Sequence, residues 1–333
     1  MTGSADSLLR VKDLTVLLET RSGQVPVVRD VSFRIGRGRT YALVGESGCG
    51  KSVTALSLLR LLDPPLAASA GAIELEGLNL LDLPPARMRA IRGRKIAMIF
   101  QEPMTALNPV LTVGEQVAEV LRLHLGMSRR QARNRSVELF REVGIPDPEQ
   151  RVREYPHRLS GGMRQRVMIA MALACDPLLL IADEATTALD VTVQAQILDL
   201  LARAQEERGM SILLITHDLG VVAELAHDVG VMYAGRIVEE AHVEALFEAP
   251  SHPYTRGLFD SLPEMRGPSG RLRAIPGVVP EPGERDGGCS FRPRCEEATE
   301  ACAVRPPPRV TRPDAGYCTC FQREGARVPG GQP

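Results

Sequence analysis

A stretch near the N-terminus has the residue types and spacing of a phosphate-binding loop. From Gly45 to Ser52 the sequence reads G-x-x-x-x-G-K-S, a pattern in which backbone N–H groups surround the α and β phosphates of a nucleotide. Lys51 can reach the β and γ phosphates, and the hydroxyl of Ser52 can bind Mg²⁺. The pattern therefore predicts a nucleotide site formed by Gly45, Glu46, Ser47, Gly48, Cys49, Gly50, Lys51, Ser52 and Val53.

The segments on either side of this loop are those that such a site needs. Tyr41 to Val44 is an apolar run with the profile of a buried strand. Val53 to Leu62 is apolar on all sides and stops at Asp63, which two prolines follow, as expected of a core helix. A chance glycine-rich turn is the alternative. The order strand, loop, helix favours the phosphate site, because the helix N-terminus also attracts an anion.

Two later apolar runs end in polar residues that suit phosphate chemistry. Leu178 to Ala182 reads as a strand buried on both faces, and Asp183 and Glu184 follow it. Asp183 suits Mg²⁺ coordination, and Glu184 can polarise an attacking water. Ser211 to Thr216 repeats the form and is followed by His217. A lone histidine after a strand is more often structural, but several strands that send polar groups to one sheet edge favour a functional role.

Four further segments read as strands. Leu8 to Leu18 and Val25 to Ile35 alternate apolar and polar residues and predict an antiparallel pair. Ala72 to Gly77 and Lys95 to Phe100 are shorter. The last of them leads into Gln101, a polar group at a strand end that could face Mg²⁺.

A helical block interrupts this α/β pattern. Apolar residues recur at helical spacing from Thr112 to Gly144, and the Arg-rich block extends to about Arg158. Its charged face is expected to be solvated surface. Ser160 is a good N-cap for the helix that continues through Val167 to Ala174. On its own, the Ser-Gly-Gly sequence before that helix indicates only a capped helix.

Taken together, these residues resemble the nucleotide-binding subunit of an ABC transporter, from about Leu8 to Leu262. Gly45 to Ser52 matches the Walker A motif, and Gln101 matches the Q-loop. Leu159 to Gln165 matches the signature, and Leu178 to Glu184 matches Walker B. Thr187 to Asp190 matches the D-loop, and His217 matches the switch histidine. The signature departs from the simple LSGGQ form, because Met163-Arg164-Gln165 replaces a single Gln. Ala185 also stands where proline often follows the catalytic glutamate.

The resemblance implies a fold and a set of roles. The fold is an α/β P-loop ABC ATPase domain over residues 1–262, with a mostly parallel core sheet, an antiparallel β subdomain and an inserted helical subdomain at about residues 104–165. Two such domains close head to tail around two ATP molecules, so Ser160 and Gly162 would serve the partner's nucleotide. The resemblance also assigns nucleotide contacts to Gly161, Gln165 and Asp190, catalytic roles to Glu184, His217 and Gln101, and Mg²⁺ to Ser52, Gln101 and Asp183.

Three stretches narrow the resemblance to the oligopeptide/dipeptide importer branch: Tyr155 to Ala170, Gln101 to Pro109, and His252 to Leu258. Within that branch the chain is similar to the D-type ATPase. This implies a second, F-type ATPase subunit, two integral membrane permease subunits and, indirectly, an extracytoplasmic solute-binding protein. The subunit would lie peripherally on the cytoplasmic face of the inner membrane. Related importers carry nickel, glutathione or other small solutes, and the ATPase sequence does not decide the cargo.

One expected residue type is missing. In the family an aromatic ring near position 18 stacks on adenine, but no aromatic residue occurs from Met1 to Asp30. An apolar contact from Leu18 or Val25 is the expected replacement.

The composition bounds the other function classes. The net charge of −1 gives no basic surplus for a nucleic-acid partner. A soluble ABC-type ATPase acting on nucleic acid or ribosomes usually has two cassettes or a long coiled coil, and neither is present. The first residues do not read as a signal peptide, and no uninterrupted run of 18 apolar residues occurs. These features predict a cytosolic chain with reduced cysteines.

The C-terminal extension, residues 263–333, differs in composition. From residue 266 onward, 21 of 68 residues are Pro or Gly, against 34 of the preceding 265. Long regular elements are therefore not expected. Five of the seven cysteines lie here: Cys289, Cys295, Cys302, Cys318 and Cys320.

These cysteines are candidates for a metal site. Zinc favours shorter C-x₂₋₄-C spacing, and disulfides are not expected in a reducing compartment. The resemblance to peptide-importer ATPases implies a [4Fe–4S] cluster, with zinc or free thiols as alternatives. Cys289, Cys295 and Cys302 would be three ligands, and Cys318 and Cys320 compete for the fourth, with Cys320 favoured by the following Phe321. A cluster here would be structural, because the extension is far in sequence from the ATP motifs. Loss of the cluster is expected to unfold the extension locally and to leave the phosphate loop intact.

Overall fold

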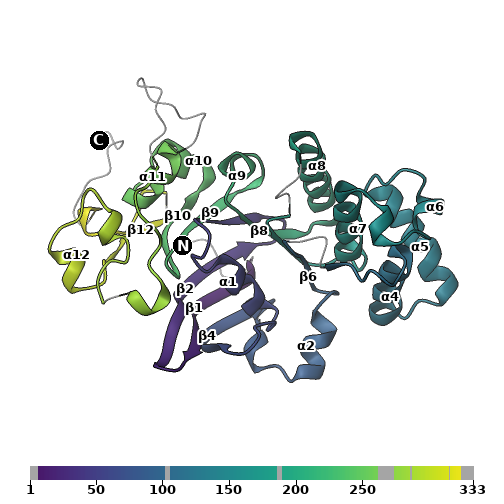
Figure 1. Ribbon diagram of the computed structural model, residues 1–333, viewed down its shortest axis with the longest axis horizontal. Coiled ribbons are helices and arrows are strands. Elements are labelled where there is room, and N and C mark those ends of the chain that lie inside the picture. Colours follow the sequence, from purple (N-terminus) through teal and green to yellow (C-terminus); the bar gives the residue numbers. More distant parts are fainter. Residues whose placement is uncertain are drawn as a thin grey trace. The chain divides into compact units, whose positions relative to one another are not determined.

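The computed structural model describes residues 7–101, 106–185, 190–261, 274–285, 287–314 and 316–323. Contacts divide the chain into two compact units. One consists of Met1–Leu9, Ile35–Thr40 and Leu75–Ile215, and we call it the helical unit. The other consists of Arg10–Arg34, Tyr41–Glu74 and Thr216–Pro333, and we call it the phosphate-loop unit. Figure 1 labels the elements of both.

The phosphate-loop unit contains a mixed sheet. Its strands are β3 (Thr40–Val44), β9 (Asp228–Tyr233), β10 (Arg236–His242), β11 (Arg309–Thr311) and β12 (Tyr317–Thr319). They lie in the order β11-β12-β10-β9-β3. β3 and β9 are parallel, whereas β9 with β10, β10 with β12, and β11 with β12 are antiparallel. The C-terminal extension therefore adds two short strands to the sheet that leads into the phosphate loop.

A second, antiparallel-type layer of this unit contains β1 (Ser7–Thr20), β2 (Gly23–Gly36) and β4 (Leu66–Leu75), in the order β2-β1-β4. The first two strands confirm the sequence prediction. β4 begins before the predicted start at Ala72, within an Ala- and Ser-rich stretch of low strand propensity. Gly71 in β4 has φ +101°, and a Cβ there would lie 2.5 Å from the carbonyl oxygen of Lys12. Glycine at position 71 therefore allows the backbone of β4 to pass close to that of β1.

The helices of the phosphate-loop unit are short. They are α1 (Lys51–Leu58), α9 (Leu219–Leu225), α10 (Val243–Glu248), α11 (Pro253–Asp260) and α12 (Ala301–Val304), with 3₁₀ turns η4 (Pro282–Glu284), η5 (Arg292–Arg294) and η6 (Phe321–Arg323). Figure 1 shows the yellow C-terminal extension beside α11 and β10. The aromatic rings of Tyr233, Tyr254 and Phe291 pack together here, with centroids 4.6 to 5.4 Å apart.

The helical unit contains a parallel sheet. β6 (Ile96–Ile99), β7 (Leu179–Asp183) and β8 (Ser211–Thr216) lie in the order β8-β7-β6, and β7 and β8 are buried along their whole length. The other elements in the described part of this unit are β5 (Leu78–Asn79), η1 (Leu80–Asp82), α2 (Pro85–Ile91), α4 (Val113–Leu125), α5 (Arg129–Glu142), α6 (Pro148–Arg151), η2 (Pro156–Arg158), α7 (Gly161–Leu173) and α8 (Val191–Arg208). The strands confirm the α/β arrangement predicted from sequence.

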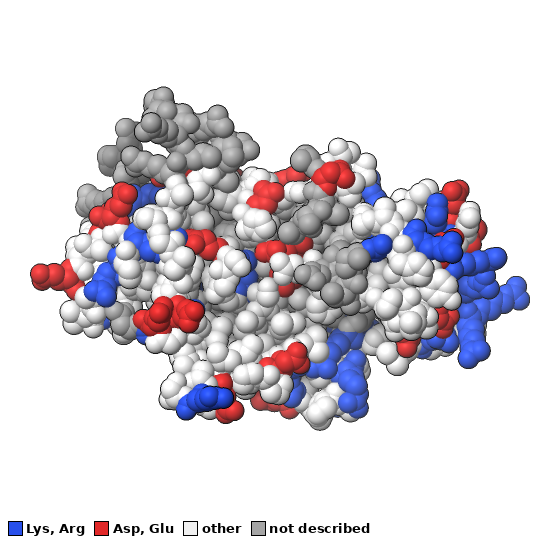
Figure 2. Space-filling model, in the orientation of Figure 1, with Lys and Arg blue, Asp and Glu red and all other residues white. Residues whose placement is uncertain are grey.

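The predicted helical block forms α4, α5 and α6 (Figure 1). α4 and α5 pack on each other and on α7, and α6 packs on α5. Its helix starts follow the sequence: Thr112 caps α4, and Ser128 with Gln131 forms a capping box at α5. Ala132, Leu139 and Phe140 are buried in α5. Basic side chains gather on the outside of these helices (Figure 2). Among the described residues, no helix has the length and apolar character needed to cross a membrane.

Candidate functional site

The phosphate loop follows β3 and leads into α1, as the sequence predicts. Gly45, Gly48 and Gly50 have φ values of +150°, +77° and +108°, which L side chains rarely adopt. A Cβ at Gly45 would lie 2.2 Å from the carbonyl oxygen of Met232. The glycines are therefore required by the path of the loop. The helix starts at Lys51 and ends at Leu58, earlier at both ends than the predicted Val53 to Leu62.

Lys51 is held inside this loop. The residue is only 6% exposed. Its Nζ donates hydrogen bonds to the carbonyl oxygens of Gly45 at 2.7 Å and Glu46 at 3.0 Å. The ammonium group thus lies against the backbone that is predicted to surround phosphates. Cys49 is fully buried and burial raises its pKa, so its contribution to the site is through its backbone.

Sequence reasoning missed two side chains that contact Glu46. The backbone N–H of Glu46 donates to the hydroxyl of Tyr254 in α11 at 2.9 Å. Arg294 in the C-terminal extension donates from Nη1 to both carboxylate oxygens of Glu46, at 3.1 and 3.0 Å. Tyr254 stands within a stretch that carries the family resemblance, but nothing in one sequence pairs either residue with the loop.

In the helical unit, the predicted acidic pair and Gln101 lie at one edge of the sheet. Asp183 ends β7 and is 4% exposed. Glu184 follows with φ +48°, and its N–H donates to the carbonyl oxygen of Ile215 at 2.9 Å. Nε2 of Gln101 donates to Oε2 of Glu184 at 2.6 Å. The structure therefore brings Gln101 and Glu184 into direct contact.

The signature segment begins α7. Ser160 is exposed and caps the helix, accepting a hydrogen bond from the N–H of Met163 at 3.3 Å. Gly161 and Gly162 form the first turn. Gln165 differs from them, because its side chain is buried and donates to the carbonyl oxygen of Ala185. This places its amide on the segment after β7, whereas the glycines lie at the accessible helix start.

The remaining predicted residues are located as follows. Asp190 caps α8 by accepting from the N–H of Val193 at 2.9 Å. Thr187 to Leu189, the rest of the D-loop, lie outside the described residues. His217 follows β8 directly and is exposed. It belongs with Lys51 and Ser52 to the phosphate-loop unit, whereas Gln101, Asp183 and Glu184 belong to the helical unit.

The C-terminal cysteines divide into two groups. Cys289, Cys295, Cys302 and Cys320 line one small pocket, together with Phe291 and Phe321. Burial raises the pKa of Cys289 to about 11 and also raises the pKa values of Cys295 and Cys320. Cys318 does not line this pocket: it lies in β12, opposite Glu239 of β10, and is 1% exposed. Among the described residues, no three His, Cys, Asp or Glu side chains are close enough to hold a metal ion as they stand.

Comparison with known proteins identifies the family. Residues 28–187 match the family described as ABC transporter, and residues 238–302 match the family described as oligopeptide/dipeptide transporter, C-terminal region. A protein of Brucella melitensis biotype 1, named as a peptide import ATP-binding protein, is 52% identical over 97% of this chain and 100% of its own. A similarly named protein of Brucella abortus strain 2308 is 52% identical over 90% of each chain.

Solved structures agree on the fold. The dimeric ATP-binding cassette MJ0796, bound to ADP and Pi in a post-hydrolysis state, has a TM-score of 0.64 and 27% identity over 71% of this chain and 98% of its own. CbiO1 from Clostridium perfringens, part of the ABC transporter complex cbiONQ, has a TM-score of 0.62 and 27% identity over 73% of this chain and 91% of its own. The predicted P-loop ABC ATPase fold is confirmed. The chain belongs to the ATP-binding subunits of the ABC transporter family, in the oligopeptide/dipeptide transporter branch.

Proposed function

We propose that this subunit hydrolyses ATP to drive uptake of oligopeptides or dipeptides through separate membrane subunits. The observation that carries the ATPase role is the phosphate loop, in which Lys51 lies against a backbone shaped by three glycines of positive φ. The cargo class is supported by the C-terminal family match over residues 238–302 and by the names of the relatives.

The described side chains divide the work of hydrolysis. Lys51 and the loop N–H groups bind the phosphates. Ser52, Asp183 and Gln101 would hold Mg²⁺, and a bound Mg²⁺ would neutralise charge on the phosphate oxygens. Their oxygen donors are the type that Mg²⁺ prefers. Glu184, oriented by Gln101, accepts a proton from the attacking water, and His217 contacts the γ-phosphate end.

A second ATPase subunit completes the proposed site. The accessible start of α7, at Ser160, Gly161 and Gly162, would contact the nucleotide held by the partner, and Asp190 would lie at the same interface. The buried amide of Gln165 supports this surface from within, through Ala185. An F-type ATPase is the proposed partner, with two permeases and an extracytoplasmic solute-binding protein. The complex would lie at the inner membrane, with this subunit on its cytoplasmic face.

The segment after Gln101 is the proposed contact with a permease. Its first residues, Glu102 to Thr105, lie outside the described part of the chain. Beyond them Leu107 is 3% exposed, and the side chain of Gln116 holds Asn108 by accepting from its N–H at 2.9 Å and donating to its carbonyl oxygen at 3.0 Å. Val110, by contrast, is 75% exposed. An anchored turn with an exposed apolar tip suits a docking surface.

For the C-terminal extension we propose a [4Fe–4S] cluster, within a domain that starts at about residue 263. The four cysteines lining one pocket, Cys289, Cys295, Cys302 and Cys320, match the four thiolates that such a cluster needs. Burial that raises thiol pKa values disfavours bare thiolates, and a bound cluster or zinc would compensate for that cost. Cys318 lies outside the pocket, which favours Cys320 as fourth ligand.

Matched cysteine variants test this assignment. Anaerobically purified protein should contain about four irons per chain and show broad visible absorption. Cys320→Ser should lose the iron, whereas Cys318→Ser should keep it. One zinc per chain without iron would assign the site to zinc. Five freely titrating thiols would contradict both the iron and the zinc assignment.

Co-purification tests the proposed complex. The tagged subunit, expressed with its neighbouring genes and extracted in detergent, should bring two hydrophobic permeases and a second ATPase. Peptide with a binding protein should stimulate its ATP hydrolysis. Stimulation by nickel or glutathione instead would reassign the cargo, and isolation without permeases would contradict the transporter role.

A further inference from the structure

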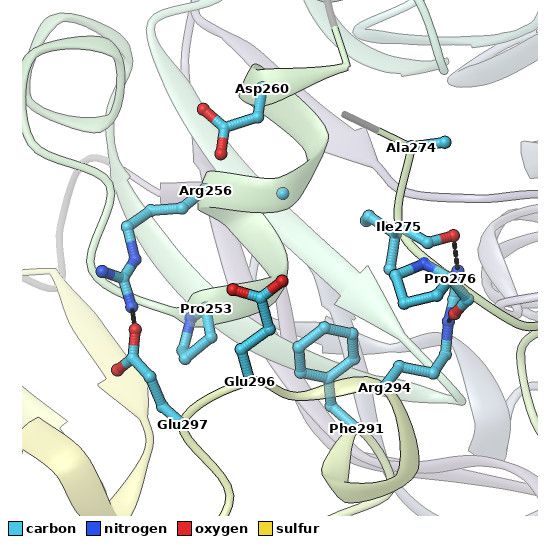
Figure 3. Close-up of a pocket in the computed structure, with 11 residues that line it drawn as sticks. Pro253, Arg256, Asp260, Ala274, Ile275, Pro276, Phe291, Arg294, Glu296 and Glu297 are labelled. Carbon is cyan, nitrogen blue, oxygen red and sulfur yellow. Dashed lines mark hydrogen bonds and ion pairs between the residues drawn. The ribbon is translucent and has the colours of Figure 1, made fainter. Parts of the chain in front are cut away.

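The C-terminal extension reaches the phosphate loop through Arg294, a residue whose side chain is 5% exposed. Its Nη1 donates to both carboxylate oxygens of Glu46, at 3.1 and 3.0 Å. Its Nε donates to the carbonyl oxygen of Pro276 at 2.7 Å and its Nη2 to that of Ile275 at 3.3 Å. Figure 3 shows Arg294 beside Ile275 and Pro276, with Phe291 of the same turn nearby. Hydrogen bonds to the carbonyl oxygens of Pro276 and Ile275 thus orient the guanidinium toward Glu46.

Glu46 is in turn held at each of its polar groups. Its N–H donates to Tyr254 at 2.9 Å, its carbonyl oxygen accepts from Lys51 at 3.0 Å, and its carboxylate accepts from Arg294. These contacts fix the peptide that follows Gly45, where the loop leaves β3. Lys51 donates hydrogen bonds to the carbonyl oxygens of Gly45 and Glu46. A shift of Glu46 would therefore also shift the ammonium group that is proposed to bind the phosphates.

The pair also has an electrostatic consequence. Glu46 places a carboxylate within a loop that is built to bind an anion. An unpaired carboxylate there would repel the phosphates through a partly desolvated space, in which charges interact more strongly than in water. Arg294 neutralises it by a charge-assisted hydrogen bond from a guanidinium that is itself nearly buried.

We propose that Arg294 is a positioning residue of the nucleotide site, so that the C-terminal extension sets the affinity of the phosphate loop for nucleotide. The inference rests on the proposed role of this loop in binding ATP. It also gives the cysteine-lined pocket a route to that site, because Arg294 lies in η5, between Cys289 and Cys295. The N–H of Arg292 donates to the carbonyl oxygen of Cys289 at 3.0 Å, and the N–H of Cys295 donates to that of Arg292. Backbone hydrogen bonds thus connect both cysteines directly to the turn that carries Arg294.

Nucleotide binding by the full-length subunit tests the proposal. We expect Arg294→Met to raise the dissociation constant for a fluorescent ATP analogue about tenfold, the factor that one charge-assisted hydrogen bond is worth. In steady-state assays of the complex, KM for ATP should rise by more than kcat falls. Arg294→Lys should recover part of the affinity, because it restores the charge but not the planar fork.

A double-mutant cycle separates positioning from general damage to the fold. In a Glu46→Gln background, Arg294→Met should weaken binding by less than threefold, because no carboxylate is left unpaired. Arg305→Met, which removes another arginine of the extension from above the ring of Phe321, should leave the dissociation constant unchanged. Equal losses from Arg294→Met in both backgrounds, or none in either, would overturn the proposal.

Lys51→Ala distinguishes this inference from the proposed function. Loss of binding in Lys51→Ala with normal binding in Arg294→Met would reject the positioning role alone. Normal binding in Lys51→Ala would reject the loop as the nucleotide site, and the inference with it. Melting temperatures measured on every variant identify any that unfold, and Arg294→Lys then carries the comparison.

Discussion

The side-chain amide of Gln101 donates a hydrogen bond to the carboxylate of Glu184, with 2.6 Å between Nε2 and Oε2. The contact follows from strand register, since Ile99 of β6 pairs with Ala182 of β7 in a parallel ladder. Gln101 lies two residues beyond Ile99 and Glu184 two residues beyond Ala182, so both side chains reach the same edge of the sheet. The amide orients the carboxylate and leaves it able to accept a proton.

Replacement of that carboxylate is the first prediction. Glu184→Gln should retain ATP binding and lower the hydrolysis rate by about 10²–10⁴, the usual value of a positioned general base. Without hydrolysis, a closed dimer with trapped ATP should accumulate. Single-turnover kinetics of the purified complex measure the rate, and size-exclusion chromatography the dimer. Turnover within a few-fold of the wild type would assign the base to another residue.

Coupling to the membrane subunits gives the second prediction. Gln116→Ala removes the side chain that holds Asn108 from both sides, so the proposed docking turn should lose its shape. Transport by the reconstituted complex should fall by more than basal ATP hydrolysis does. Glu115→Ala, at the neighbouring exposed position, is the matched control. Equal losses of transport and hydrolysis in Gln116→Ala would contradict the docking role.

A buried ion pair makes the third prediction, on stability. Arg312 of the extension is 6% exposed and Glu239 of β10 is fully buried, and the two are in direct contact. Arg312 also donates to the carbonyl oxygens of Ala249 at 3.1 Å and Ala245 at 3.0 Å. Arg312→Met leaves the carboxylate without its cation and should lower the free energy of unfolding by about 3–5 kcal/mol.

Urea denaturation measures this loss against that of a second arginine, Arg309, which lies in β11. The exposed Arg309 stacks on the ring of Tyr317, with 3.4 Å from its guanidinium carbon to the ring centroid. Arg309→Met should cost only about 0.5–1 kcal/mol. If the two variants unfold at the same urea concentration, the ion pair with Glu239 is not what anchors the extension.

The fourth prediction concerns pH. The hydroxyl of Tyr41 donates to Glu240 at 3.0 Å, and desolvation of that carboxyl raises its pKa from 4.5 to about 7. Between these values the folded chain keeps a proton that the unfolded chain releases. The contribution of Glu240 to stability is therefore complete below about pH 4.5 and is lost as the pH rises toward 7.

Glu240→Gln isolates this contribution, because glutamine stays neutral. The variant should gain stability relative to the wild type as the pH is raised from 4.5 to 7, and the difference should level off above 7. Unfolding curves at half-unit pH intervals measure it. A difference that stays constant over this range would show that Glu240 is already ionised in the folded chain.

Local patterns predicted the motif-bearing elements of this chain well. The glycines from Gly45 to Gly50 can take only a few backbone paths between a buried strand and a helix, so their spacing was informative. Ser160 was predicted as an N-cap from its side chain alone and is one. The start of β4 at Leu66 was missed, because Ala and Ser have little strand preference and only pairing with β1 makes them extended.

The structural role of the extension could not be read from sequence. The extension is far in sequence from the ATP motifs, yet Arg294 contacts Glu46 across 248 positions of sequence. β11 and β12 have three residues each, too few for a periodic pattern. From the sequence, the cysteines are predicted to stabilise this region. In the structure, arginines also join it to the rest of the unit: Arg285 donates to Val27, Arg294 to Glu46, and Arg312 to Glu239. Arginine is so frequent in this chain that the sequence does not indicate which arginines make these contacts.

In the proposed function, ATP hydrolysis by this subunit drives peptide uptake. It is tested most directly by accumulation of a labelled dipeptide or oligopeptide in proteoliposomes that contain the whole complex, with the solute-binding protein on the outside and ATP–Mg²⁺ sealed inside. We expect uptake against a gradient, and we expect this uptake to require ATP. Glu184→Gln in this subunit should lower uptake in proportion to hydrolysis. Undiminished uptake with Glu184→Gln, or hydrolysis without any peptide accumulation, would contradict it.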